Sequence, residues 1–292
     1  MAGAALAACL MPVPVLAASS FPVTVTDALG RTVVVPRRPR RILPIFASNV
    51  EILCAIDGPD RIVGIEDWTR FPPEVMGRPR IGGRLGFSAE AVVGLAPDLV
   101  VVTPARQAVH QLLRPLDEVG IPLVVFHHPD IKAVLANIAT MGRLIGREDV
   151  AADLRGRLDA RMGAIARQVA GRPRPRVYLE TGDNGNGGYQ SVRPGSYCDD
   201  ILLRAGADNV FAGRDHLSQV SGEAVLAADP DVILVAAATL PDVAGRPGWD
   251  GLRAVRTGRV HACPRAELLI PGPRVVDGID RLARLFQDNG GR

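Results

Sequence analysis

The chain has 292 residues, 47% of them hydrophobic, which is enough to bury a large core in one big domain or in two lobes of ordinary size. The formal net charge is only +3, and we read no basic block or interleaved aromatic stretch of the kind that binds nucleic acid, so we expect no nucleic-acid partner. Lys132 is the only lysine, so nearly every basic residue is an arginine. Because this preference for arginine runs through the whole chain, the presence of an arginine at a position is not by itself evidence of function.

The chain opens with an uncharged, apolar stretch that ends in small residues. We interpret residues 1–18 as a secretory signal, cleaved near Ala17 or Ala18, and we expect a periplasmic protein. The alternative is a lipoprotein box ending at Cys9, which would tether the protein to a membrane through a lipid. No later run reaches the ~18 apolar residues expected of a membrane helix.

Three cysteines remain after cleavage: Cys54, Cys198 and Cys263. Export would permit a disulfide between Cys198 and Cys263, but buried free thiols are favoured for an odd number of scattered cysteines.

Strand and helix patterns alternate through the first half. An entry hairpin is predicted at residues 23–36, followed by a strand at "RILPIF" and a helix that a capping box, Ser48 to Glu51, would open. Further strands are predicted at "RIVGIE", "PRIGG" and "IPLVVF", with a proline-bearing loop at "DWTRFPPEV". This order favours a largely parallel sheet covered on both faces.

Residues 131–170 show no strand pattern. Apolar residues at helical spacing predict a long helix from about Asp149 to Ala170, roughly 33 Å in length. The second half then restarts with a strand at "RVYLE", a glycine-rich loop "TGDNGNGGYQSV", a helix from about Ser196, strands at "DVILVAA" and "GRVHAC", and a final helix from Pro273 to Phe286.

A phrase of fifteen residues occurs twice, as "SAEAVVGLAPDLVVV" at 88–102 and "SGEAVLAADPDVILV" at 221–235. Each copy predicts an N-cap serine, a glutamate in the first helical turn, a stop at Pro-Asp and a buried strand. We therefore predict an α/β fold of two related Rossmann-like lobes with parallel sheets, joined by a single long α-helix. The expected boundaries are 1–18 for the signal, 21–129 for the N-terminal lobe, 130–171 for the connecting helical segment and 172–292 for the C-terminal lobe.

The sequence resembles the substrate-binding proteins of ABC importers for iron-siderophores, cobalamin and haem. The resemblance covers nearly the whole mature chain in family order and includes "TDALGRTVVVPRRPRRIL", "SNVEIL", "DRIVGIEDWTRFPPEV", "IGGRLGFSAEAVVGLAPDLVVV", "GSYCDDILLRAGADNVF", "SGEAVLAADPDVILV" and "PGPRVVDGIDRLARLF". It implies two Rossmann-like lobes bridged by one long helix, with a ligand held between them. We also expect a monomer, and only modest closure on ligand binding because one long helix resists a wide hinge motion.

The resemblance also implies a partner, the permease dimer in the cytoplasmic membrane with its ATPase. In the family a glutamate on each lobe docks onto arginines of the permease, and Glu90 and Glu223 match these positions. The alternative is that both glutamates merely stabilise their own helix ends, by about 0.3 to 1 kcal/mol each.

Candidate ligand contacts lie on loops that match the cleft of the family. They are Trp68, Arg84, Tyr189, Arg193, His216, Leu217 and Glu267. A structural role stays open for each of the aromatic residues and a solvated role for each arginine, although the few apolar neighbours of Tyr189 in sequence favour ligand contact.

The ligand that we expect is a metal chelate, a ferric siderophore first, because arginine suits carboxylate or catecholate oxygens. A corrinoid ranks second and haem third, since aromatic residues make up only 4% of the chain. Tyr189 or His216 could serve as a haem axial ligand, but nothing selects them. His110 has no partner at ligand spacing, and we expect the His127-His128 pair to be structural. We expect no catalytic residue, resident metal or cofactor.

Two other classes of function are the alternatives. A two-lobed chelatase-like or nucleotide-dependent enzyme is disfavoured because "GDNGNGG" lacks the GxGxxG spacing and a P-loop lysine, and no HExxH or GxSxG motif occurs. A binding lobe that serves a sensor rather than an importer is the other alternative.

Overall fold

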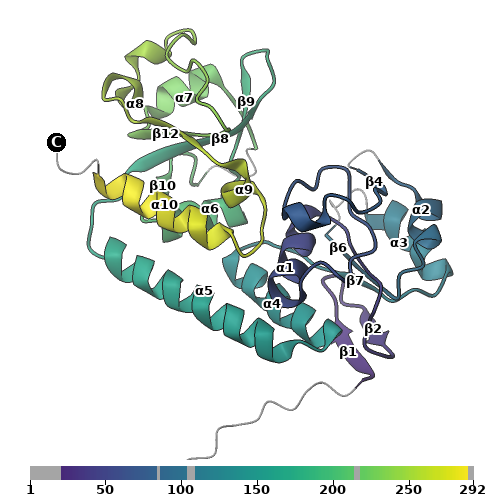
Figure 1. Ribbon diagram of the computed structural model, residues 1–292. Helices are drawn as coiled ribbons and strands as arrows, with labels where there is room; N and C mark the ends of the chain where they lie inside the picture. The colour runs from purple at the N-terminus through teal and green to yellow at the C-terminus, as the bar shows by residue number, and fades with distance from the viewer. Residues whose placement is uncertain (1–20, 84–85, 104–108, 214–217, 289–292) are drawn as a thin grey trace, which may run out of the picture.

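The structure is a computed structural model that describes residues 21–83, 86–103, 109–213 and 218–288. In it the chain forms two α/β lobes joined by one long helix, α5 (Glu148–Val169), as Figure 1 shows. Its 22 residues span about 33 Å. The predicted fold class, including the long helix, is confirmed.

The N-terminal lobe is built on a small parallel sheet. Its strands are β3 (Ile42–Pro44), β6 (Leu99–Val102) and β7 (Leu123–Val125), paired in the order β3-β6-β7. Every residue of these strands is buried, which explains their continuous apolar sequence. The predicted entry hairpin is confirmed as β1 (Val23–Thr26) paired with β2 (Thr32–Val35). A second, two-residue hairpin consists of β4 (Gly82–Gly83) and β5 (Gly86–Phe87).

The C-terminal lobe carries a larger, mixed sheet. Its strands are β8 (Arg176–Asp183), β9 (Gly188–Ser191), β10 (Asp208–Asn209), β11 (Gln219–Ser221), β12 (Val232–Ala236) and β13 (Val260–Cys263). The order is β11-β9-β8-β12-β13, with β10 also on β8. The central strands β8, β12 and β13 run parallel, whereas β9 and β11 are antiparallel additions at one edge.

Helices connect and cover these strands. In the N-terminal lobe and connecting segment they are α1 (Ala47–Asp57), η1 (Pro73–Val75), α2 (Ala89–Gly94), α3 (Val109–Glu118), α4 (Ile131–Ile145) and α5. In the C-terminal lobe they are α6 (Tyr197–Arg204), α7 (Gly222–Ala228), η2 (Trp249–Gly251), α8 (Arg253–Arg256), α9 (Arg265–Leu269) and α10 (Val275–Asp288).

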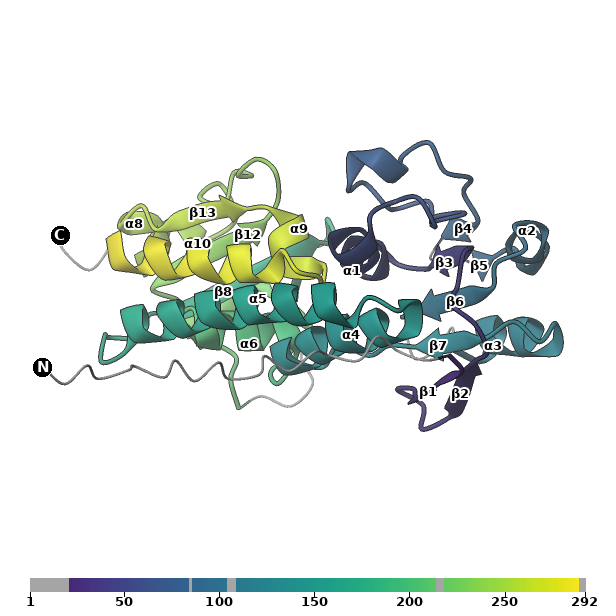
Figure 2. The ribbon, with the colours of Figure 1, turned by 60° about the horizontal axis from the view of Figure 1, so that its bottom comes forward.

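One hydrophobic core runs through both lobes. Figure 2 shows α5 alongside α10, and the same buried cluster holds Leu158 and Ile165 of α5, Ile52 of the N-terminal lobe and Ile279 of α10. The two lobes therefore share packed apolar surface, which resists a wide separation because separation would expose that surface to water.

Three local predictions differ from the structure. The strand predicted at 61–66 is reduced to single bridges, Ile42 with Ile62 and Ile65 with Arg80. The glycine-rich loop is wrong for most of its length, because β8 and β9 form a hairpin across it. The capping box is also wrong: α1 begins at Ala47 after Phe46, which makes no side-chain cap.

His128 is buried in the segment that connects β7 to α4. It is 7% exposed, and neither ring nitrogen has a hydrogen-bond partner among the described residues. Burial, helped by the neighbouring His127, lowers the pKa of His128 from 6.5 to about 4. The predicted structural role for this pair therefore holds for His128, while Asp130 caps α4 by accepting the Ala133 N–H at 2.7 Å.

This burial makes the protein sensitive to acid. Below pH 6.5 the unfolded chain protonates His128, but the folded protein does so only near pH 4, so the free energy of unfolding falls as the pH drops through that window. The loss attributable to His128 is about 3 kcal/mol when complete. We expect His128→Phe to remove it, as measured by urea denaturation at pH 7 and pH 4. The exposed His127 provides the matched control: an equal effect of His127→Phe would contradict this assignment.

Candidate ligand-binding cleft

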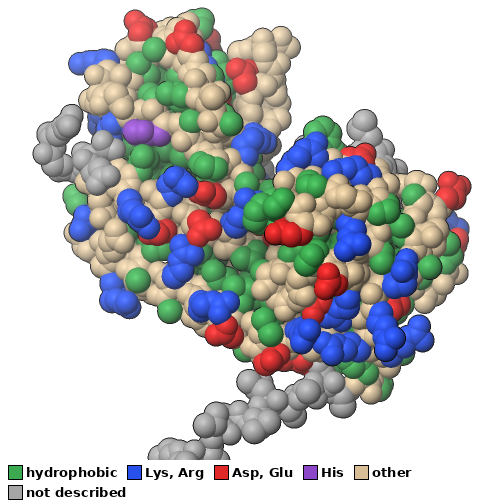
Figure 3. Space-filling model, viewed as in Figure 1, with side chains coloured by type: hydrophobic (Ala, Val, Ile, Leu, Met, Phe, Trp, Pro, Cys, Tyr) green, Lys and Arg blue, Asp and Glu red, His purple; other side chains and the backbone are tan. Residues whose placement is uncertain are grey.

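The candidate cleft lies where the strand ends of the two lobes face one another. Arg265 follows β13, a parallel strand, and so lies at the edge at which open α/β sheets bind their ligands. Arg193 follows the antiparallel strand β9, and Trp68 follows the bridge at Ile65. Figure 3 shows a notch between the lobes, with Lys or Arg side chains on both of its sides.

Trp68 presents an exposed aromatic face on the N-terminal lobe. The indole is 60% exposed, although its loop is anchored by the fully buried Thr69. A Cβ added at Gly83 would lie 2.9 Å from the indole Nε1, so the absence of a side chain there lets the ring lie close to β4. Burying an exposed indole is favourable, and this placement therefore fits the predicted ligand contact.

The C-terminal lobe contributes a polar pocket of about 370 Å³. Its described lining is Thr181, Gln190, Ser191, Val192, Arg193, Ser196, Tyr197, Cys198, Ser218, Arg265 and Leu269. Arg193 is exposed, and the guanidinium of Arg265 is oriented by bonds to the carbonyl oxygens of Thr181 and Ala236 at 2.8 and 3.1 Å. Two arginines thus offer N–H donors to oxygen atoms of a ligand.

Tyr189 does not line this pocket. It is 6% exposed and packs against Trp249 at 5.0 Å between ring centroids, with Arg246 stacked 4.4 Å from its ring. The structure corrects the predicted ligand contact to a core role. The two partners, Trp249 and Arg246, come from positions 60 and 57 residues further on, which local sequence could not reveal.

The Glu267 side chain pairs with another residue of the protein. Its carboxylate forms a bidentate ion pair with Arg281 of α10, at 2.7 and 2.9 Å. Arg265 and Leu269, one helical turn apart, line the pocket, whereas Glu267 between them is not part of its lining. The predicted ligand contact at Glu267 is thus replaced by a structural ion pair, and Arg265 is the residue of this helix that sequence reasoning missed.

The remaining candidate contacts, Arg84, His216 and Leu217, lie outside the described residues, as do the signal sequence and Cys9. The three described cysteines are free, as expected. Burial raises the pKa of the Cys54 thiol to about 12 and those of Cys198 and Cys263 to about 11, so thiolates are scarce at neutral pH.

A buried ion pair joins the two lobes beside the cleft. Arg274, just before α10, donates from Nη2 and Nε to the Glu51 carboxylate of α1 at 2.6 and 2.9 Å. The Arg274 guanidinium also lies 4.0 Å from the ring of Phe71. Gly272 permits the approach, since a Cβ there would sit 3.0 Å from Glu51 Oε2. We call Glu51, Phe71 and Arg274 the inter-lobe clasp.

The two predicted docking glutamates occupy equivalent places. Ser88 Oγ accepts the Ala91 N–H at 3.1 Å and Ser221 Oγ accepts the Ala224 N–H at 3.2 Å, which confirms both N-caps of the repeated phrase. Glu90 and Glu223 lie exposed in the first turns of α2 and α7. Each lobe therefore presents one exposed carboxylate in the first turn of the helix that its copy of the repeated phrase forms.

The described residues contain no group of three or more His, Cys, Asp or Glu side chains placed to hold a metal ion. Within the same part of the chain, no helix is long and apolar enough to cross a membrane.

Two α/β lobes joined by a long helix, with an exposed aromatic residue on one lobe and a pocket containing arginines on the other, are typical of a two-lobed binding protein. Comparison with known families extends this conclusion: residues 44–267 match the model of the periplasmic binding protein family, and the chain belongs to that family. It is accordingly a binding protein of the kind that serves ABC importers.

The chain is similar to family members with three different stated ligands. It is 30% identical to a cobalamin-binding protein of Halobacterium salinarum, over 93% of this chain and 76% of the relative. It is 27% identical to the structure of an Fe3+-hydroxamate transport protein of Saccharomonospora viridis, with a TM-score of 0.74 over 91% of this chain and 99% of the other. A periplasmic heme-binding protein of Pseudomonas aeruginosa is 26% identical, with a TM-score of 0.73 over 86% and 94% of the two chains.

Proposed function

We propose that this protein captures a corrinoid in the cleft between its lobes and delivers it to the permease of an ABC importer. The observation that carries the proposal is the exposed indole of Trp68 on one lobe together with the pocket containing Arg193 and Arg265 on the other. An indole can cover the apolar face of a macrocycle, while guanidinium groups suit its phosphate and amide oxygens.

The similarity to the cobalamin-binding relative across 93% of the chain supports placing the corrinoid ahead of the ferric siderophore that the residues alone favoured. A siderophore stays the second candidate, because two arginines in one polar pocket also suit an anionic iron chelate. The similarity to the Fe3+-hydroxamate transport protein supports this candidate too.

Haem is the weakest of the three candidates. An axial ligand must reach the iron, and the buried Tyr189, packed beneath Arg246, could do so only after the core had opened. His216, the other residue considered for this role, lies outside the described residues.

The delivery step requires a membrane partner. We propose that a permease dimer with its ATPase receives the protein through Glu90 and Glu223, and that the protein works as a periplasmic monomer. The exposure of both carboxylates and their matched positions on the two lobes support this arrangement. No catalysis or resident cofactor is needed for capture and release.

Tryptophan fluorescence tests the ligand and its place together. The chain has two tryptophans, and Trp249 is 1% exposed, so a bound ligand is expected to quench mainly Trp68. We expect saturable quenching by cyanocobalamin or cobinamide, lost in Trp68→Phe although the emission of Trp249 persists. The matched variant Trp249→Phe should keep the quenching. Saturation by ferric siderophores alone would favour the second candidate, and quenching that survives in Trp68→Phe would contradict the site.

A further inference from the structure

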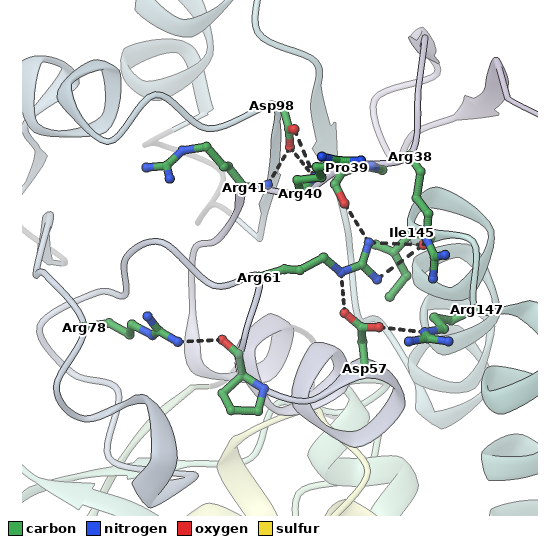
Figure 4. A network of polar contacts seen from close by, with 11 residues as sticks. Arg38, Pro39, Arg40, Arg41, Asp57, Arg61, Arg78, Asp98, Ile145 and Arg147 are labelled. Atoms are coloured by element: carbon green, nitrogen blue, oxygen red, sulfur yellow. Dashed lines mark hydrogen bonds and ion pairs between the residues drawn. The ribbon is translucent and has the colours of Figure 1, made fainter.

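A second pocket, lined with arginines, lies on the N-terminal lobe away from the cleft. Its volume is about 870 Å³, and Figure 4 shows the polar network around it. The described lining consists of Arg37, Arg38, Pro39, Arg40, Arg41, Asp57, Asp60, Arg61, Asp98 and Arg147.

The parallel strands place this pocket opposite the cleft. Arg41 and Asp98 immediately precede β3 and β6, so they lie at the amino ends of strands whose carboxyl ends face the ligand. Helix α1 starts at the cleft side and reaches the pocket at Asp57, its last residue. The arginine pocket is therefore separate from the candidate ligand site.

Some of these arginines form hydrogen bonds and ion pairs that hold the walls of the pocket together. Arg61 donates to the carbonyl oxygens of Pro39 and Ile145 at 2.6 and 3.3 Å, where α4 ends. Arg38 donates from Nε to the same Ile145 oxygen at 3.1 Å. Asp57 is 4% exposed and pairs with both Arg61 and Arg147, and these bonds outweigh its burial and lower its pKa. The walls of the pocket are thus held in place.

The lining of the pocket carries more positive than negative charge even after these ion pairs are counted. The described lining has six arginines and three aspartates, an excess of three charges that equals the formal net charge of the entire chain. Asp98 is already engaged by the backbone N–H groups of Arg40 and Arg41, at 3.0 and 2.9 Å. The guanidinium groups of Arg37 and Arg40 are exposed and have no ion-pair partner among the described residues.

We propose that this pocket binds an oxyanion of the phosphate class that carries two or more negative charges. Guanidinium groups donate paired N–H bonds to phosphate oxygens, and several of them lining one pocket favour a multiply charged group over a single chloride. Arg37, Arg40 and the free Nη atoms of Arg38 are the donors. The phosphate can belong to a soluble compound or to the headgroup of an anionic lipid, and the experiment separates these two sources.

The test is a calorimetric titration of the full mature protein with inorganic tripolyphosphate at physiological salt. We expect saturable binding that weakens by about tenfold or more in the double variant Arg37→Ala/Arg40→Ala, because two charge-assisted contacts are lost. Both side chains are exposed, so the variant should fold normally. The matched control is Arg172→Ala/Arg256→Ala, which removes two exposed arginines outside the pocket and should change nothing.

A second arm uses sedimentation with vesicles of phosphatidylcholine, with and without cardiolipin, whose headgroup carries two phosphates and therefore two negative charges. Loss of binding in the pocket variant but not in the control supports the proposal, and the arm in which it occurs identifies the source of the phosphate. The proposal is overturned if wild-type protein binds neither probe saturably, or if the pocket variant and the control weaken binding equally.

Discussion

Replacing Glu90 and Glu223 together by arginine is expected to abolish substrate uptake while leaving ligand affinity unchanged. Both carboxylates are exposed and neither is part of the described lining of the pocket, so the substitutions should not alter ligand affinity. If arginines of the permease receive them, reversal sets like charges against each other, which costs several kcal/mol and should lower uptake by about tenfold or more. Uptake is measured with the cognate permease and ATPase in proteoliposomes.

Two controls separate docking from folding. Glu118→Arg reverses an exposed glutamate on α3, outside the repeated phrase, and should leave uptake intact. Co-purification of the permease with the binding protein gives a readout that does not depend on the ligand. Wild-type uptake and co-purification by the Glu90→Arg/Glu223→Arg variant would refute the docking role, leaving both glutamates as stabilisers of their own helix ends.

Arg274→Ala is expected to destabilise the protein by about 3 kcal/mol, because it leaves a buried carboxylate without its partner. Glu51 is 2% exposed, and its burial raises the pKa of the carboxyl even though Arg274 lowers it. The loss should also loosen the lobes, since Arg274 and Glu51 belong to different ones. Urea denaturation measures the stability, and small-angle scattering without ligand measures the spread of the lobes.

The ion pair of Arg281 with Glu267 is the matched control. It is bidentate too, but Arg281 is 52% exposed, so Arg281→Ala should cost less than about 1 kcal/mol. The double variant Glu51→Leu/Arg274→Met should regain much of the stability, because apolar replacement removes both buried charges together. Equal losses in Arg274→Ala and Arg281→Ala, with unchanged scattering, would show that the inter-lobe clasp does not hold the lobes.

The features predicted well from sequence are those that neighbouring residues decide. The repeated phrase carries its own N-cap and its own stop signal, and both copies fold as expected. The apolar face of α5 is likewise predicted from the helical spacing of its apolar residues. Such signals need no knowledge of what packs on them.

The predictions that fail concern residues whose contacts come from distant parts of the sequence. Glu51 has the spacing of a capping box, yet it pairs with Arg274, more than 200 residues further on. Tyr189 has few apolar neighbours in its glycine-rich segment, which favoured ligand contact, yet Arg246 and Trp249 cover it. The basic run from Arg37 to Arg41 carries no functional signal in an arginine-rich sequence, and only the fold brings Arg61 and Arg147 beside it.

The most direct test of capture in the cleft is the titration of wild-type protein and Trp68→Phe with cyanocobalamin, followed by tryptophan fluorescence. The account predicts saturable quenching with one ligand per protein in the wild type and none in Trp68→Phe. Silence of the wild type toward corrinoids and ferric siderophores alike, or equal quenching in both proteins, would contradict the proposed capture of a metal chelate against Trp68.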